Sequence, residues 1–356
     1  MNMNRRDFIR LSSMAGAGAL VGCQTAPVLG KVEPKFAWSA LIHLGMNEWH
    51  DDVGYEQKWP NLTDPIEAKA IAEEYVCADH VRFDEAVWGR VSRKLWDSGM
   101  NQLVIDLGEA VVYPSHPEIA AKGAWSPDKL RAELRRLRGM GIEPIPKLNF
   151  STTHDLWMGV YHRMVSTPQY YAVVRDLIRD VCEIFDWPRY FHLGLDEENS
   201  SFQSYGQKIT IVREKPLWWE DLHFYVSEVE RHGARAWVWS GCARAFPREV
   251  FVKNMPKSVV QSPWWYTGDL NDQKYTPTRA LVELAQLDYD VVPCSSNCYS
   301  YKDAMSAVVK FCDERFDPKH VLGYQMAPWL EMNTVLERRW NAAADDLAAA
   351  IRQHKA

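Results

Sequence analysis

The sequence lacks any block rich in lysine and arginine. It contains 41 Lys and Arg residues against 47 Asp and Glu residues, which gives a formal net charge of -6. Proteins that bind nucleic acid usually present a concentrated positive surface to the phosphates. We therefore expect no nucleic-acid partner.

Patterns typical of metal sites are also missing. None of the seven cysteines forms a Cys-x-x-Cys pair, and no two histidines are spaced as His-x-x-x-His. Structural zinc sites usually draw their ligands from such close pairs. We expect no metal and no other cofactor. The six cysteines after Cys23 are interpreted mainly as buried thiols, with one or two disulfide bonds as the alternative.

A glycine-rich turn after the first predicted strand is absent, which argues against a dinucleotide-binding open sheet. Instead, eight short apolar segments alternate with amphipathic ones, the pattern of a (β/α)8 TIM barrel. The predicted strands are 36–44, 102–107, 143–148, 190–196, 234–240, 258–262, 290–295 and 320–326. The predicted helices are 83–97, 129–138, 169–185, 218–231, 247–254, 279–287, 301–315 and 333–354.

The N-terminal segment has the features of an export signal rather than of a barrel element. Arg5 and Arg6 precede a short run of small and apolar residues, too short to span a bilayer, which ends in Leu-Val-Gly-Cys at Cys23. We interpret residues 1–23 as a twin-arginine signal peptide with a lipobox, 24–35 as a linker and 36–356 as the barrel. Lipidation at Cys23 would be its contact with the membrane, and the protein would be periplasmic or exposed at the cell surface. In the alternative, the signal is an ordinary cleaved one and Cys23 is incidental.

Aromatic residues are abundant, with 16 Trp and 15 Tyr. They are consistent with large side chains of the core. They are equally consistent with a sugar-binding cleft, because flat indole rings cover the apolar faces of pyranose rings while the N–H groups still form hydrogen bonds.

The stretch FHLGLDEENS, residues 191–200, places three acidic residues after an alternating apolar pattern. On a strand, Tyr190, His192, Gly194 and Asp196 share one face. On a barrel, that face points inward, so that Asp196 and Glu197 emerge at the C-terminal rim, where active sites of this fold lie. In the alternative, the acidic residues cap the next helix or bind a loop amide.

This stretch resembles the fourth-strand motif His-x-Gly-Gly-Asp-Glu of family 20 glycoside hydrolases, the β-N-acetylhexosaminidases. Segments 99–119 and 141–154 are similar to the family's second and third strands, the latter with matches at Ile145, Pro146 and His154. AWVWSG, VVQSPWW, CYSYKDA and LGYQMAPWLE are similar to the segments that supply its pocket aromatics. The resemblance covers roughly residues 95–335.

The resemblance implies that Glu197 is the general acid/base and that Asp196 orients the acetamido group of the substrate, whose own oxygen attacks the sugar. It places Trp239, Trp264 and Trp329 in the wall of the acetamido pocket. The acetamido oxygen would be bound by Tyr301, with Tyr299 as the rival residue. The other predicted substrate-binding residues are His43, Asn149, His154, His192, Asp303 and Glu331. The partner would be an oligosaccharide or glycoconjugate, and the sequence gives no signal for an oligomeric state.

The sequence departs from the family pattern at several positions. Leu195 replaces the second glycine of the motif, and Lys147 and Asn149 stand where the third strand of the family is acidic. At the first strand, His43 and its neighbours replace a sugar-binding arginine. Two other functions therefore stay open. One is a retaining glycosidase that acts on a non-acetylated sugar and uses two carboxylates, with Glu331 as nucleophile. The other is a non-catalytic glycan-binding lipoprotein.

Overall fold

The computed structural model describes residues 36–51, 63–272, 274, 276–298 and 303–355. The predicted signal peptide, the linker, Cys23, Tyr299 and Tyr301 lie outside these residues. Residues 36–356 form one unit. In its described part, no helix combines the length and the apolar character needed to cross a membrane.

Eight parallel strands form the centre of this unit. They are β1 Ala37–His43, β2 Gln102–Asp106, β3 Glu143–Lys147, β4 Tyr190–His192, β5 Arg235–Trp239, β6 Val260–Ser262, β7 Cys294–Ser295 and β8 Gly323–Met326. Consecutive strands pair from β1 to β6, and β8 pairs with both β1 and β7. Between β6 and β7, the amides of Val292 and Cys294 donate to the carbonyls of Gln261 and Pro263. These bonds close the sheet into the predicted (β/α)8 barrel.

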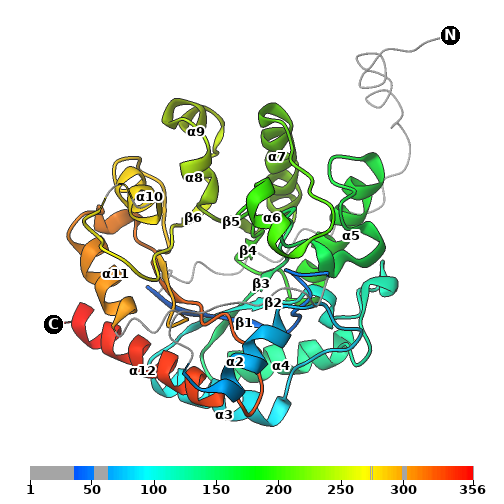
Figure 1. Ribbon diagram of the computed structural model, residues 1–356, viewed down its shortest axis with the longest axis horizontal. Helices are drawn as coiled ribbons and strands as arrows, with labels where there is room; N and C mark the ends of the chain where they lie inside the picture. The colour runs from blue at the N-terminus through cyan, green and yellow to red at the C-terminus, as the bar shows by residue number, and fades with distance from the viewer. Residues whose placement is uncertain (1–35, 52–62, 273, 275, 299–302, 356) are drawn as a thin grey trace. The chain divides into compact units, whose positions relative to one another are not determined.

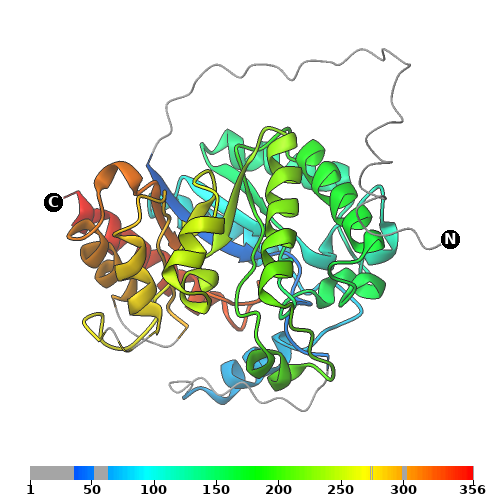
Figure 2. The same ribbon diagram turned by 90° about the horizontal axis from the view of Figure 1, so that it is seen from above.

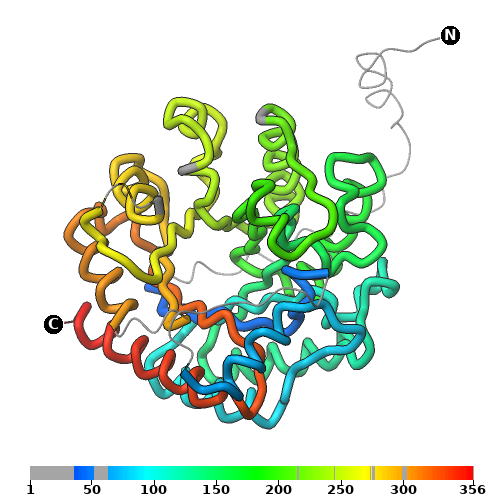
Figure 3. The backbone as a smooth tube through the Cα atoms, in the orientation of Figure 1, coloured from blue at the N-terminus to red at the C-terminus, as the bar shows by residue number. Residues whose placement is uncertain are grey.

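Helices connect the strands and surround them (Figure 1). They are α2 Pro65–Glu74, α3 Glu85–Asp97, α4 Pro127–Gly139, α5 Pro168–Ile184, α6 Ser200–Gly206, α7 Lys215–Arg231, α8 Gly241–Ala245, α9 Arg248–Asn254, α10 Thr276–Leu284, α11 Ala304–Asp313 and α12 Glu337–His354. The chain passes once around the barrel, so that its C-terminal part returns beside β1 (Figure 3). Ser126 and Thr167 cap two of these helices, since their hydroxyls accept hydrogen bonds from backbone amides in the first turns of α4 and α5.

Two layers of apolar side chains pack against the strands. The inner layer fills the barrel and includes Leu41, Ile145, Tyr190 and Trp237. The outer layer lies between strands and helices and includes Phe191, Leu193 and Leu195. Around β4, the prediction that Tyr190 points into the barrel while Phe191, Leu193 and Leu195 point out toward the helices is therefore confirmed.

The predicted length of the fourth strand is wrong. The strand ends at His192, because Gly194 and Leu195 have φ angles of 70° and 65°, which no strand residue adopts. Glycine is required at position 194, where a Cβ atom would lie 1.9 Å from Oδ1 of Asn149. The close approach of Asn149 fixes where the acidic loop leaves the barrel.

Several helices were not predicted from the sequence, among them α2 and α6. Figure 2 shows α2 and α6 projecting from the same end of the barrel, below it in this view. They lie in the segments that follow β1 and β4, so this is the end to which the strands deliver their C-termini. The active sites of (β/α)8 barrels are built at this end.

Three cysteines illustrate the interpretation of this residue type as core thiols. Cys182, Cys294 and Cys312 are fully buried thiols. Burial raises the pKa of Cys182 to about 12. Such thiols act as small apolar side chains and are unreactive near neutral pH.

Candidate active site

A cavity of about 260 Å³ lies at the C-terminal end of the barrel. Its walls come from the segments after β1, β3, β4, β6, β7 and β8, and from the end of β5. The lining residues are Trp49, His50, Tyr75, Thr153, His154, Asp196, Glu197, Phe202, Tyr205, Trp239, Trp264, Tyr266, Cys298 and Trp329. The predicted pair Asp196 and Glu197 thus lies in the same cavity as all three predicted tryptophans.

The two carboxylates share one histidine. Nε2 of His154 lies 3.4 Å from Oδ2 of Asp196 and 3.5 Å from Oε2 of Glu197. In an extended chain, adjacent side chains point in opposite directions. Here Glu197 has a φ of 57°, and this turn of the backbone brings both side chains to the same histidine.

Electrostatics fix the charge of this cluster. Burial alone would lower the pKa of His154, but the charges and hydrogen bonds of Asp196 and Glu197 raise it to about 10. Burial alone would raise the pKa of Asp196, yet the charge and hydrogen bond of His154, followed by Lys147 and Asn149, hold it well below its usual range. At neutral pH the site therefore contains an imidazolium ion beside an ionised Asp196.

The atoms of His154, Asp196 and Glu197 are close enough together to hold a metal ion, each offering one ligand atom. A metal ligand must be a neutral imidazole. Asp196 and Glu197 raise the pKa of His154, so a metal ion at this cluster would have to displace the proton of its imidazolium.

Neighbouring side chains hold the loop that carries the two carboxylates. The amide of Asn149 donates to Oδ1 of Asp196 at 3.1 Å. The hydroxyl of Ser151 donates to the carbonyl of Asp196, and that of Thr153 donates to the carbonyl of Glu197 at 2.7 Å. The segment after β3 therefore positions the pair through both side-chain and backbone atoms.

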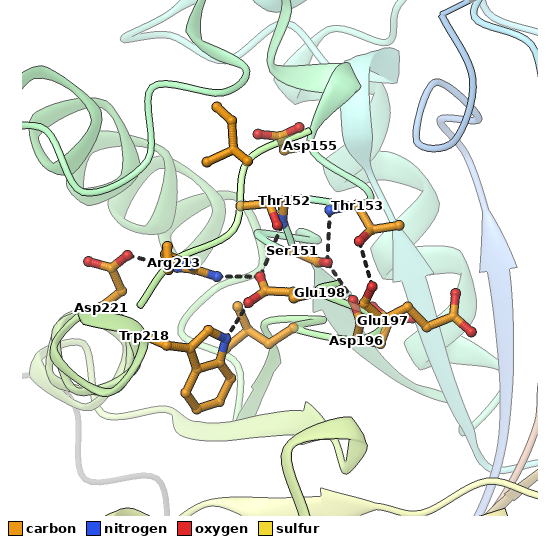
Figure 4. A network of polar contacts seen from close by, with 12 residues as sticks. Ser151, Thr152, Thr153, Asp155, Asp196, Glu197, Glu198, Arg213, Trp218 and Asp221 are labelled. Carbon is orange, nitrogen blue, oxygen red and sulfur yellow. Dashed lines mark hydrogen bonds and ion pairs between the residues drawn. The ribbon is translucent and has the colours of Figure 1, made fainter. Parts of the chain in front are cut away.

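The third acidic residue, Glu198, points away from the cavity (Figure 4). It accepts hydrogen bonds from the amide of Thr152 at 3.0 Å, from Arg213 and from the indole of Trp218. Arg213 also pairs with the buried Asp221 at 2.7 Å. Glu198 therefore anchors the loop in the body of the protein, while its two predecessors face the cavity.

Aromatic rings form the deep wall of the cavity. The ring centroids of Trp239 lie 6.0 Å from those of Trp264 and 5.6 Å from those of Trp329. Tyr266 adds a fourth ring, 6.4 Å from Trp329. The rings are tilted to one another, at interplanar angles of 81° for Trp239 and Trp264 and 48° for Trp239 and Trp329. The wall is therefore an apolar concave surface with N–H and O–H groups at the ring edges, and a pyranose ring could pack against one ring face.

Five predicted substrate-binding residues with described side chains lie outside the cavity lining. One is Asn149, which holds Asp196 as described above. Asp303 is exposed at the N-terminus of α11. Glu331 pairs with Arg82, at 3.2 Å from Oε1 to Nε. His43 and His192 are fully buried below the cavity.

His43 and His192 belong to a second cluster of charged and polar side chains, which lies inside the barrel. His43, Asp106, Lys147 and His192 pair in register across β1 to β4 and form one buried polar row. Nζ of Lys147 donates to Asp106 and, at 3.3 Å, to Glu48. Burial lowers the pKa of His43 to about 3 and that of His192 well below its usual range. Lys147 is thus the positive charge of this row, and both histidines are neutral.

The cavity includes residues that the sequence did not single out. Trp49 and Tyr75 come from the segment between β1 and α3, and Phe202 and Tyr205 come from α6. Tyr266 and Cys298 follow β6 and β7. Only Tyr266 had a sequence signal, since it comes two residues after Trp264.

No protein-family model matches the sequence, and the comparison with curated proteins gives no significant match. Solved structures do match. One is the β-N-acetylhexosaminidase of Bacteroides fragilis, with a TM-score of 0.56 and 13% identity over 88% of this chain and 66% of that one. The barrel of this chain is thus similar in fold to barrels of solved glycoside hydrolase family 20 proteins.

Two further structures have the same barrel. The family 20 exo-β-N-acetylglucosaminidase of Vibrio harveyi, solved with N-acetylglucosamine, has a TM-score of 0.54 and 14% identity over 78% of this chain and 56% of its own. Dispersin B has a TM-score of 0.53 and 16% identity over 77% of this chain and 96% of its own. The match thus spans 66% of the Bacteroides fragilis protein and 56% of the Vibrio harveyi protein, which is two thirds or less of each. At such identities, the likeness establishes the fold alone.

Proposed function

We propose that the protein is a glycoside hydrolase that removes terminal β-linked N-acetylhexosamine by substrate-assisted catalysis with retention of configuration. The observation that carries this proposal is the placement of Asp196, Glu197 and His154 in a cavity walled by Trp239, Trp264 and Trp329. Support also comes from the barrel type, since the matched structures include proteins named β-N-acetylhexosaminidase.

In the first step, the carbonyl oxygen of the substrate's acetamido group attacks C1 while the bond to the leaving oxygen breaks. Glu197, whose side chain is 27% exposed, donates a proton to that oxygen. Asp196, held ionised by His154, accepts the acetamide N–H and balances the positive oxazolinium that forms.

In the second step, water attacks C1 from the face that the leaving group vacated. The Glu197 carboxylate accepts the proton of this water, and the oxazolinium ring opens to regenerate the acetamido group. Because each of the two steps inverts C1, the product keeps the β configuration.

The geometry gives less support to the two-carboxylate alternative. Among the described residues that line the cavity, Asp196 and Glu197 are the carboxylates, and both contact His154. Glu331, the predicted nucleophile of that alternative, is outside this lining and paired with Arg82.

The experiment measures hydrolysis of aryl N-acetyl-β-glucosaminide and N-acetyl-β-galactosaminide beside their 2-hydroxy counterparts. We expect selective cleavage of the acetamido substrates and a loss of about 10²- to 10⁴-fold in kcat for Glu197→Gln, with an unchanged circular dichroism spectrum. A thiazoline analogue of the oxazolinium should inhibit competitively. Cleavage of only the 2-hydroxy sugars, or a fully active Glu197→Gln variant, would refute the proposal.

We also propose that the twin-arginine segment exports the protein and that Cys23 carries a lipid, which would hold the enzyme at a periplasmic or outer surface. The Leu-Val-Gly-Cys sequence supports this. Labelled fatty acid should be incorporated into the full-length protein but not into Cys23→Ser. Equal labelling of the two would exclude this anchor.

A further inference from the structure

Helix α6 has its polar and apolar faces reversed. Gln203 is 1% exposed, whereas Phe202 is 42% and Tyr205 60% exposed. A surface helix normally buries its aromatic residues and exposes its glutamines. The reversal indicates that the exposed rings have a function outside the fold itself.

The buried glutamines fix α6 to the cavity wall. Gln203 donates to the Thr152 hydroxyl at 3.2 Å and accepts from the amide of Ile211 at 2.7 Å. Gln207 donates to the carbonyl of Thr153 at 2.6 Å. These bonds hold the helix in place, with Phe202 and Tyr205 at the lining of the cavity.

The N-terminus of α6 is tied to the proposed acid/base. Asn199 caps the helix by accepting from the amide of Phe202 at 3.0 Å, and its own backbone amide donates to the carbonyl of Glu197 at 2.7 Å. The position of the helix is therefore fixed relative to Glu197. A general acid must lie beside the leaving oxygen of its substrate.

The cavity itself separates two binding regions. Trp239 and Trp264 are almost fully buried and form the deep wall, whereas Phe202 and Tyr205 line the same cavity and remain exposed. A terminal sugar that reacts against the deep wall would direct its leaving group past Glu197 toward these two rings.

We infer that Phe202 and Tyr205 form a platform that binds the leaving-group sugar of an oligosaccharide. This inference rests on the proposed function, because it uses Glu197 to define the side of the leaving group. The ring centroids lie 6.4 Å apart at an interplanar angle of 77°, so the two rings offer one face and one edge. Such surfaces bind the apolar face of a pyranose. The substrate class is therefore a glycan with a sugar, rather than a small alcohol, on the reducing side of the cleaved bond.

The test is a comparison of binding affinities that needs no turnover. Calorimetry on the Glu197→Gln protein would measure the Kd of N-acetylglucosamine and of its β-1,4-linked disaccharide. We expect the disaccharide to bind more tightly, and the added Phe202→Ala and Tyr205→Ala changes to remove about tenfold of its affinity while leaving the monosaccharide unaffected. Tyr205→Trp should restore much of the difference.

Ile209→Ala is the matched control, since Ile209 is exposed on the same segment and is not part of the cavity lining. It should leave both affinities unchanged. Three results would each overturn the platform. The Glu197→Gln protein could bind the two sugars with equal affinity, the added Phe202→Ala and Tyr205→Ala changes could weaken both sugars equally, or the protein could bind no sugar. A change in sedimentation mass without a change in sugar affinity would assign the rings to a protein contact instead. If the proposed hydrolysis is wrong but the platform is right, the wild-type protein would cleave no substrate and would still bind the disaccharide more tightly than the monosaccharide.

Discussion

Among the residues that the structure describes, two clusters each contain one histidine and two carboxylates whose ligand atoms lie within 4.8 Å of one another. One, formed by His154, Asp196 and Glu197, lines the cavity. The other, formed by His43, Glu48 and Asp106, is fully buried around Lys147. The residue types are the same, but the source of the positive charge differs.

The two histidines also differ in charge state. In the cavity, no lysine of the described residues pairs with the carboxylates, and the charges and hydrogen bonds of Asp196 and Glu197 raise the pKa of His154 to about 10. In the buried row, Lys147 contacts both carboxylates, and the pKa of His43, lowered chiefly by burial, falls to about 3. The proximity of a histidine to acidic residues is thus not enough to identify a reactive site. The charge balance and the access of solvent also have to be known.

The largest expected effect comes from breaking the buried row. Lys147→Met leaves the carboxylates of Glu48 and Asp106 buried without their cation, and we expect a loss of about 3 to 5 kcal/mol in the free energy of unfolding. Urea unfolding would measure this. Lys122→Met, which removes an exposed pair with Asp79, serves as the control and should change stability little.

A triple variant sharpens this prediction. Lys147→Met combined with Glu48→Gln and Asp106→Asn removes all three charges together, and we expect it to recover much of the lost stability. If the triple variant is as unstable as Lys147→Met, then packing around the lysine, and not its charge, stabilises the row.

The next effect comes from the cavity cluster. His154→Gln removes the cation shared by Asp196 and Glu197, and we expect kcat on an acetamido substrate to fall about 100-fold. Without His154, the pKa of Asp196 should rise. The acid limb of the pH–kcat/KM profile should therefore move to higher pH. A lower kcat with an unmoved acid limb would mean that His154 acts by shape alone.

The sequence predicted the barrel, and it singled out Asp196, Glu197 and three tryptophans that the structure places in one cavity, for local reasons. Alternating apolar segments specify strands, and Ser126 and Thr167, each followed by proline, specify helix starts. Asp196 follows strand β4 and Trp239 ends strand β5. Both therefore lie at the same end of the barrel, and formation of the barrel is enough to bring them together.

The other residues depend on loop conformation and on distant contacts. The positive φ angles after His192 follow from the approach of Asn149, which no local pattern encodes. Glu331 is drawn away from the cavity lining by Arg82, more than two hundred residues earlier in the chain. Helix α6 was missed because its aromatic residues face outward, opposite to the pattern by which helices are recognised.

A smaller expected effect is that the two clusters contribute to the stability of the fold in opposite pH ranges. The pKa of His154 is raised from 6.5 in the unfolded chain to about 10, so its stabilisation is complete below pH 6.5 and is lost as pH rises toward 10. The pKa of His43 is lowered from 6.5 to about 3, so its contribution is present above pH 6.5 and is lost as pH falls toward 3.

Thermal unfolding across this pH range would test both slopes. His154→Gln should flatten the alkaline side, and His43→Gln should reduce the slope on the acid side without abolishing it, since the pKa of His50 is also lowered by burial, to about 4. A flattening on the same side in both variants would contradict the assigned charge states.

The smallest expected effect concerns Glu331, which decides between one-carboxylate and two-carboxylate chemistry. Its carboxylate pairs with Arg82 and accepts from the side-chain amide of Asn333 at 2.8 Å, so its loss should loosen the loop after β8 without removing a reacting group. We expect Glu331→Gln to change kcat by less than about twofold, with a lower melting temperature. A large loss of kcat that azide restores would identify a covalent nucleophile. Substrate-assisted attack would then be wrong, even though Glu197 would keep its role as the acid.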